Sequence, residues 1–99
     1  MEHIKFTFSA TRQLSRPVQV GVVASGDLEV LFQPDQGNSL VVTIISSSEN
    51  SEPRWQYLFE RMRNTTEFPS GSLLLHDSAA TPGLARLRIE QAFEEAADE

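Results

Sequence analysis

The chain has 99 residues and a mass of 11.1 kDa, the size of one small domain with one hydrophobic core. Eight Lys and Arg residues against fourteen Asp and Glu residues give a net charge of −6, which argues against nucleic acid or an anionic membrane as a partner. The absence of cysteine excludes disulfides, a thiolate nucleophile and cysteine-based metal centres. We therefore expect residues 1–99 to form a single acidic domain with no thiol of its own.

The start of the chain lacks the basic residues and the continuous apolar stretch of a secretory signal. No apolar run approaches the ~20 residues that cross a bilayer as a helix. We therefore expect a cytoplasmic protein without a membrane segment.

Four segments in the first half of the chain are typical of strands, because apolar and polar residues alternate in them or β-branched residues dominate. Their apolar positions are Ile4, Phe6 and Phe8, then Val18, Val20, Val22 and Ala24, then Leu28, Val30 and Phe32, and finally the run from Leu40 to Ile45. Only Ser25-Gly26-Asp27 separates the second segment from the third, which predicts a tight hairpin. We expect the four strands to form an antiparallel meander.

The second half of the chain changes period. Apolar residues recur at helical spacing after Ser51, with Pro53 in the first turn, and again after the cap signal Thr81-Pro82. The two apolar stripes are Trp55, Leu58, Phe59 and Met62, and Ala85, Ile89, Ala92, Phe93 and Ala96. Leu73 to Leu75 predict a short buried strand between the helices. The second helix should run to about Asp98, although the alternation of Ala85, Leu87 and Ile89 also allows a strand at its start.

The element order ββββαβα indicates an α+β fold. We expect an antiparallel-rich sheet of about five strands with two helices packed on one face. Trp55 should be buried between the first helix and the sheet, because it lies on that helix's apolar stripe.

Few residues can carry chemistry. His3 and His76 are the only imidazoles, and neither has the spacing of a metal site. His76 and Asp77 are adjacent at a strand end and should point to opposite faces, so they do not predict a catalytic dyad. No phosphate-binding loop or hydrolase motif is present. We expect no catalytic residue and no metal.

Ser25 is the residue most open to modification. It lies at a predicted turn, where Gly26 removes side-chain bulk on one side and Asp27 offers a nearby acceptor. The same three residue types are also those that an unmodified turn uses. The residues alone leave both interpretations open.

Three long blocks give this chain a family resemblance. They are GVVASGDLEVL at 21–31, RWQYLFER at 54–61, and the stretch from His76-Asp77 through ATPG at 80–83 to RLRIEQAFEE at 86–95. The chain resembles the acyl carrier protein, or delta subunit, of bacterial malonate decarboxylase over nearly its whole length. The residues up to about Arg16 and the turn around Asn38 depart from the pattern, which concerns assembly contacts more than Ser25.

The resemblance implies a covalent cofactor. In that family the serine matching Ser25, flanked by the positions of Gly26 and Asp27, carries phosphoribosyl-dephospho-coenzyme A through a phosphodiester. The arm ends in a thiol and carries acetyl and malonyl groups as thioesters for malonate catabolism. The implied partners are the acyl-transferase and decarboxylase subunits, the prosthetic-group transferase and malonyl transacylase. This chain would then be a non-catalytic carrier, with a β-rich fold unlike that of helical acyl carrier proteins.

Two other interpretations remain. Ser-Gly-Asp also resembles the carrier subunit of citrate lyase, and a non-catalytic binding domain could have an unmodified turn at Ser25. Asp27 and Glu29 beside the serine further suggest an acidic rim for partners with basic surfaces.

Overall fold

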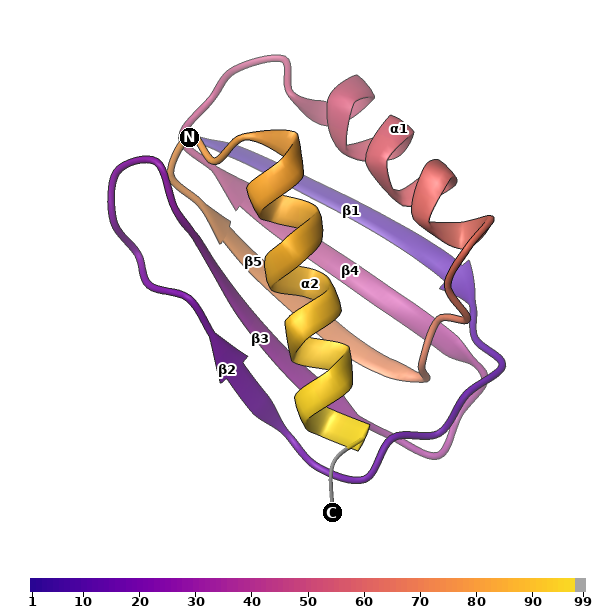
Figure 1. Cartoon of the computed structure of the whole chain (residues 1–99). Coiled ribbons are helices and arrows are strands. Elements are labelled where there is room, and N and C mark those ends of the chain that lie inside the picture. The colour runs from indigo at the N-terminus through magenta and orange to yellow at the C-terminus, as the bar shows by residue number, and fades with distance from the viewer. Residues whose placement is uncertain (98–99) are drawn as a thin grey trace.

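The computed structural model describes residues 1–97 as a five-stranded sheet with both helices on one face (Figure 1). The elements are β1 (Glu2–Ser9), β2 (Val18–Val20), β3 (Leu28–Pro34), β4 (Ser39–Ser46), α1 (Glu52–Arg63), β5 (Gly71–Asp77) and α2 (Pro82–Ala97). The predicted α+β class, the order ββββαβα and the two helices on one face are confirmed. The predicted helix end at Asp98 lies outside the described residues.

The strands lie in the order β1-β4-β5-β3-β2. β4 pairs antiparallel with β1 and parallel with β5, while β3 pairs antiparallel with β5 and β2. The predicted meander is therefore wrong, because β5 lies between the consecutive strands β3 and β4. The chain leaves β4 through α1 and returns as a parallel strand, which requires a long connection of this kind. Alternation within a strand carries no information about its neighbours.

The core lies between the helices and one face of the sheet. Each helix buries the stripe that its spacing predicts, and the strands contribute alternate residues. The strand residues of this face that are fully or nearly fully buried are Ile4, Phe8, Val20, Leu28, Val30, Phe32, Leu40, Val42, Ile44, Leu73 and Leu75. Trp55 is only 5% exposed, which confirms its predicted place. Phe59 stacks on Phe8 with 5.4 Å between ring centroids and joins α1 to β1.

The start of α2 is a helix and not a strand. The backbone N–H of Leu84 donates a hydrogen bond of 3.2 Å to Oγ1 of Thr81, as expected for a helix cap. Ala85 and Ile89 are buried while Leu87 is 50% exposed. In a strand the three side chains would share one face, whereas the helical turn points Leu87 away from the core. No helix within residues 1–97 is long and apolar enough to span a membrane.

β2 is shorter than the alternation predicts. It ends at Val20, and the side chains of Val22 and Val23 are 56% and 63% exposed. Gly21 has a φ of +80°, and a Cβ at this position would lie 2.0 Å from the carbonyl oxygen of Leu28. Only glycine fits this conformation and this close approach, which turn the chain out of the strand. The predicted tight hairpin is therefore wrong, and residues 21–27 form a wider loop.

Candidate functional site

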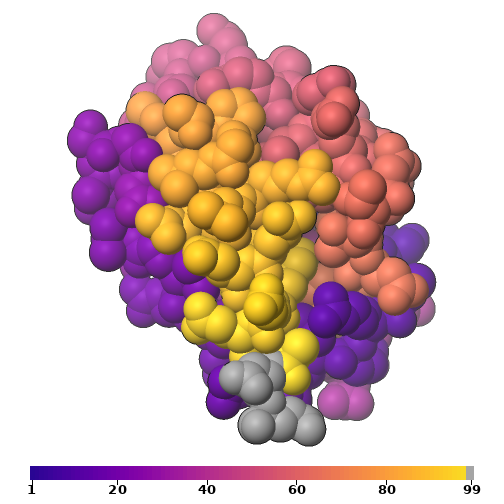
Figure 2. All heavy atoms as spheres, viewed as in Figure 1, coloured from indigo at the N-terminus to yellow at the C-terminus, as the bar shows by residue number. Residues whose placement is uncertain are grey.

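The loop at residues 21–27 lies at one end of the sheet, next to the segment that leads from β5 into α2 (Figure 1). Figure 2 shows this loop on the surface beside the start of α2. The carboxyl ends of β4 and β5 meet at this end, since Ser46 pairs with Asp77. The strand, the helix start and the loop therefore come together around the candidate residues.

Ser25 lies at the tip of a β-turn within this loop. The backbone N–H of Asp27 donates a hydrogen bond of 2.9 Å to the carbonyl of Ala24, so Ser25 and Gly26 are the central residues. Gly26 has a φ of +79°, as a type II turn requires at its third position. Ser25 is exposed, and no residue within 1–97 hydrogen bonds to its hydroxyl. A Cβ built on Gly26 would meet no atom within 4 Å, so the space beside the hydroxyl is open.

The base of the turn is fixed to the end of β5. The N–H of Gly26 donates a 2.6 Å hydrogen bond to the carbonyl of Ser78, and the N–H of Ser78 donates one of 3.1 Å to the carbonyl of Asp27. These bonds extend the β3–β5 ladder beyond the pair Leu28–Asp77. The serine is thus both exposed and held on an ordered backbone.

The side chain of Asp27 secures the turn from the other side. Its carboxylate accepts hydrogen bonds from the N–H of Leu28 at 2.7 Å and from Nε of Arg88 at 3.2 Å. The Leu28 N–H bond first, and the Arg88 guanidinium second, hold the pKa of the Asp27 carboxyl below its ordinary value. The carboxylate is committed to these partners and is not the acceptor for Ser25 that the sequence suggests.

Arg88 is the residue of this site that the sequence analysis missed. It lies on α2, 61 residues from Asp27 in the chain. No local motif distinguishes Arg88 from any other surface arginine on this helix. Only the packing of α2 across β3 brings its guanidinium to the turn.

Glu29 is also paired within the chain. Its carboxylate accepts a hydrogen bond of 2.8 Å from Nε2 of Gln19 and lies 2.9 Å from Nδ1 of His76. Together with the Asp27–Arg88 pair, this means that the expected acidic rim does not consist of free charges. The guanidinium of Arg88 would weaken the attraction that Asp27 exerts on a basic partner.

His76 and Asp77 point to opposite faces of the sheet, as predicted. Asp77 is buried and accepts hydrogen bonds of 2.9 Å from Oγ of Ser46 and from the N–H of Ala80. It thereby joins β4, β5 and the segment before α2. Within residues 1–97 no three His, Cys, Asp or Glu side chains gather as a metal site would need.

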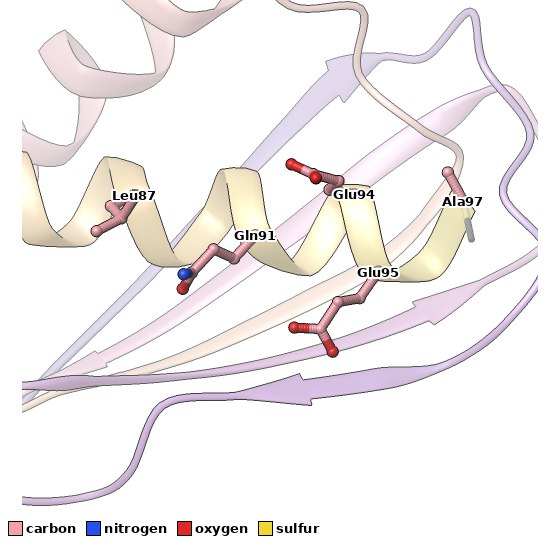
Figure 3. A pocket seen from close by; sticks show the side chains of 5 residues that line it. All are labelled: Leu87, Gln91, Glu94, Glu95 and Ala97. Carbon is pink, nitrogen blue, oxygen red and sulfur yellow. The ribbon is translucent and has the colours of Figure 1, made fainter.

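One hollow of the surface lies away from the turn. It measures about 800 Å³ and follows the outer side of α2. Figure 3 shows its lining side chains, which are Leu87, Gln91, Glu94, Glu95 and Ala97. All come from one helix and point in different directions, so no second element encloses a ligand there. We do not assign a site to it.

The turn at Ser25 offers one kind of chemistry. It presents a primary hydroxyl in open space, and no residue within 1–97 is placed to remove its proton. A serine that acts as a nucleophile in its own active site needs such a base. The geometry therefore leaves the Ser25 hydroxyl accessible from outside but gives it no base of its own within the described residues.

Comparison with known proteins gives the family. A family profile described as malonate decarboxylase delta subunit (MdcD) matches residues 15–96. The chain belongs to the malonate decarboxylase delta-subunit family. This confirms the resemblance drawn from the three sequence blocks, and the match includes the whole loop that carries Ser25.

Individual members of the delta-subunit family match over almost their full length. A malonate decarboxylase acyl carrier protein of Klebsiella pneumoniae is 52% identical over 97 residues, covering 98% of each chain. One from Stutzerimonas stutzeri is 45% identical over 95 residues, covering 96% of each chain. A chain in the crystal structure of a Pseudomonas malonate decarboxylase hetero-tetramer in complex with malonate superposes with a TM-score of 0.91 at 44% identity, covering 97% of this chain and 99% of that one.

Proposed function

We propose that this chain is the acyl carrier subunit of a bacterial malonate decarboxylase and that Ser25 is the residue that carries its prosthetic group. The exposed Ser25 hydroxyl on a fixed turn carries this proposal, because such a hydroxyl can be reached by a modifying enzyme without unfolding the domain. The names of the relatives support the carrier role. The residues 1–99 would act together as one carrier domain.

The attached group is proposed to be phosphoribosyl-dephospho-coenzyme A, joined to Ser25 by a phosphodiester. The turn fits such a group, because the position beside Gly26 is open and no neighbour occupies the hydroxyl. When bound, the group supplies the thiol that this cysteine-free chain lacks, and acetyl and malonyl groups are carried on it as thioesters.

The residues of the chain hold the attachment point. Gly26 allows the positive φ of the turn, and its N–H fixes the turn to Ser78. Asp27 and Arg88 tie the end of the turn to α2. A fixed base lets the mobile part of the arm reach several active sites while the protein surface around Ser25 stays the same for each partner.

The chemistry is proposed to belong to other subunits. The partners would be the acyl-transferase and decarboxylase subunits, the prosthetic-group transferase and malonyl transacylase, with no role for nucleic acid or a membrane. The Pseudomonas neighbour, which is part of a hetero-tetramer, supports the presence of further subunits. We propose a cytoplasmic, non-catalytic carrier, because the coenzyme A derivative that it needs would be supplied in that compartment.

Mass spectrometry of the protein purified from a native host tests the proposal. We expect the intact mass to exceed that of the chain by one phosphoribosyl-dephospho-coenzyme A, and fragmentation to place the addition on Ser25. Ser25→Ala should abolish it. Ser47→Ala is the matched control, since Ser47 is also exposed and follows the neighbouring strand end. Unmodified protein from a host that decarboxylates malonate would refute the proposal.

The same measurement addresses the two alternatives. A non-catalytic binding domain would leave Ser25 unmodified in every host. A citrate lyase carrier would have the adduct but would accept acetyl and citryl groups. The full-length match to malonate decarboxylase carriers supports the first proposal over this one.

A further inference from the structure

A groove of about 300 Å³ runs between α1 and the first turns of α2. Arg54, Tyr57 and Arg61 line it from α1, and Pro82, Gly83 and Arg86 line it from α2. We name it the arginine groove. It differs from the larger hollow on α2 because two elements form its walls. Three of the eight basic residues of this acidic chain gather here.

Within the part of the chain that the structure describes, two of these guanidinium groups have no carboxylate partner. Within residues 1–97, Arg54 has no ion pair or side-chain hydrogen bond. Within the same residues, the polar and cation–π interactions of Arg61 are both with Tyr57: it donates a hydrogen bond of 3.1 Å to the phenol oxygen, and its Cζ lies over the ring, 5.5 Å from the centroid. In contrast, Arg63 pairs with Glu60 on the same helix. The groove therefore has positive charge that the chain leaves available for an anion.

The groove also offers the contacts that a nucleotide uses. Arg54 and Arg61 have forked donors that match phosphate oxygens. Tyr57 is 63% exposed and offers an aromatic ring to a planar base. A Cβ built on Gly83 would meet no atom within 4 Å, so the backbone at the start of α2 is open to close approach.

The groove lies within reach of the proposed attachment point. The turn at Ser25 is bonded through Gly26 to Ser78. Four residues lead from Ser78 to Pro82 at the mouth of the groove, and four residues of chain span at most about 14 Å. Figure 2 shows the start of α2 between the 21–27 loop and α1 on one face of the molecule. The phosphates, ribose units and nucleoside make up the part of the arm next to Ser25, so they are the groups that face this segment.

We infer that the arginine groove binds the phosphate and nucleoside part of the prosthetic group carried on Ser25, as a resting position between transfers. This inference rests on the proposed function. A tethered ligand has a high effective concentration, so a shallow groove with modest affinity suffices and still releases the arm. Because the arm is attached to the same chain, we expect it to occupy the groove in preference to an acidic segment of a partner subunit.

Amide NMR spectra of the isotope-labelled full chain test the inference, with and without modification of Ser25. Intact mass establishes the modification of each sample. In the modified protein we expect shifts at Tyr57, Arg61 and Gly83 in addition to those around Ser25. The double variant Arg54→Gln/Arg61→Gln should lose the groove shifts and keep those at the turn. The control Arg63→Gln should keep both sets, because Arg63 lies outside the groove and pairs with Glu60.

The outcomes separate the two proposals. Groove amides that do not move in a sample of confirmed modified mass would overturn the inference and leave the proposed function standing. An unmodified mass from the native host would overturn the function itself. Shifts at the groove that appear only after addition of the other subunits would identify a protein occupant and would also overturn the inference. Inorganic diphosphate added to the modified protein should compete with the arm and diminish the groove shifts.

Discussion

The carboxylate of Asp27 and the guanidinium of Arg88, separated by 61 residues in the chain, form an ion pair with 3.2 Å between Oδ1 and Nε. The pair joins the loop that presents Ser25 to the second turn of α2. Gly21 lies beside the same contact, since a Cβ built at this position would be in ordinary van der Waals contact, at 3.5 Å, with Cδ of Arg88. The orientation of the turn thus depends on a helix far from it in sequence.

Replacing Arg88 should loosen the turn without unfolding the domain. In Arg88→Gln we expect hydrogen exchange of the Gly26 amide to accelerate by about an order of magnitude. In the native protein the turn must break the Asp27–Arg88 ion pair to open, and in the variant this pair is absent. The urea midpoint should change little. Modification of Ser25 by the transferase should slow, whereas Arg63→Gln should leave both measurements unchanged. Exchange at Gly26 that is the same in both variants would contradict a positioning role for Arg88.

The lowered pKa of Asp27 predicts how the turn responds to pH. A carboxyl with a folded pKa below its ordinary value of 3.8 stabilises the fold above pH 3.8, where it is charged in both states. That contribution is lost as the pH falls from 3.8 through the folded pKa. We therefore expect Gly26 amide protection to hold at neutral pH and to fall below pH 3.8. In Asp27→Asn the protection should be weaker at neutral pH and should lack this acid transition.

The two loop glycines should differ in their tolerance of alanine. Gly26→Ala meets no atom but must adopt a positive φ, which costs about 1–2 kcal/mol. Gly21→Ala carries the same strain and in addition places its Cβ 2.0 Å from the Leu28 carbonyl oxygen. Urea unfolding should therefore show the greater loss of stability for Gly21→Ala. Equal losses would mean that the close approach at Gly21 is relieved at no cost.

Trp55 should anchor α1 on the sheet. Its replacement by alanine should cost about 3–5 kcal/mol, as expected for removal of a large buried side chain. The folded protein should have a blue-shifted fluorescence maximum, since this is its single tryptophan. Tyr57→Ala is the control on the same helix. The Tyr57 side chain is exposed, so its replacement should lower the free energy of unfolding far less. A Trp55 fluorescence maximum typical of full exposure to water would contradict the burial of Trp55.

Ser25→Ala should leave stability unchanged. The side chain is exposed and has no hydrogen bond within residues 1–97, so we expect a change within about 0.5 kcal/mol in urea unfolding. The same variant should lose the added mass completely. A large loss of stability would indicate that the serine supports the fold and would weaken its proposed role as a free attachment point.

Local pattern was enough to predict most elements of this fold. Alternation in β1 and β3 and the helical spacing in α1 and α2 indicate which side of each element is buried, whereas β4 was predicted from its Val and Ile content alone. The stripe containing Trp55, Phe59 and Met62 is an example, since its members are buried as the spacing requires. Family membership was also readable from the three long blocks, and the delta-subunit profile that matches residues 15–96 confirms it.

The neighbours of each element depended on tertiary structure. Alternation gives a strand its two faces but no partner, so the placement of β5 between β3 and β4 could not be read from either strand. The end of β2 at Val20 could not be predicted either. The apolar alternation continues through Val22 and Ala24, although the backbone already leaves the sheet at Gly21. The pairing of Asp27 with Arg88 and the groove between α1 and α2 arise from side chains distant in sequence. Such contacts form only when the helices pack on the sheet, because the sequence that separates the contacting residues does not set the distance between them.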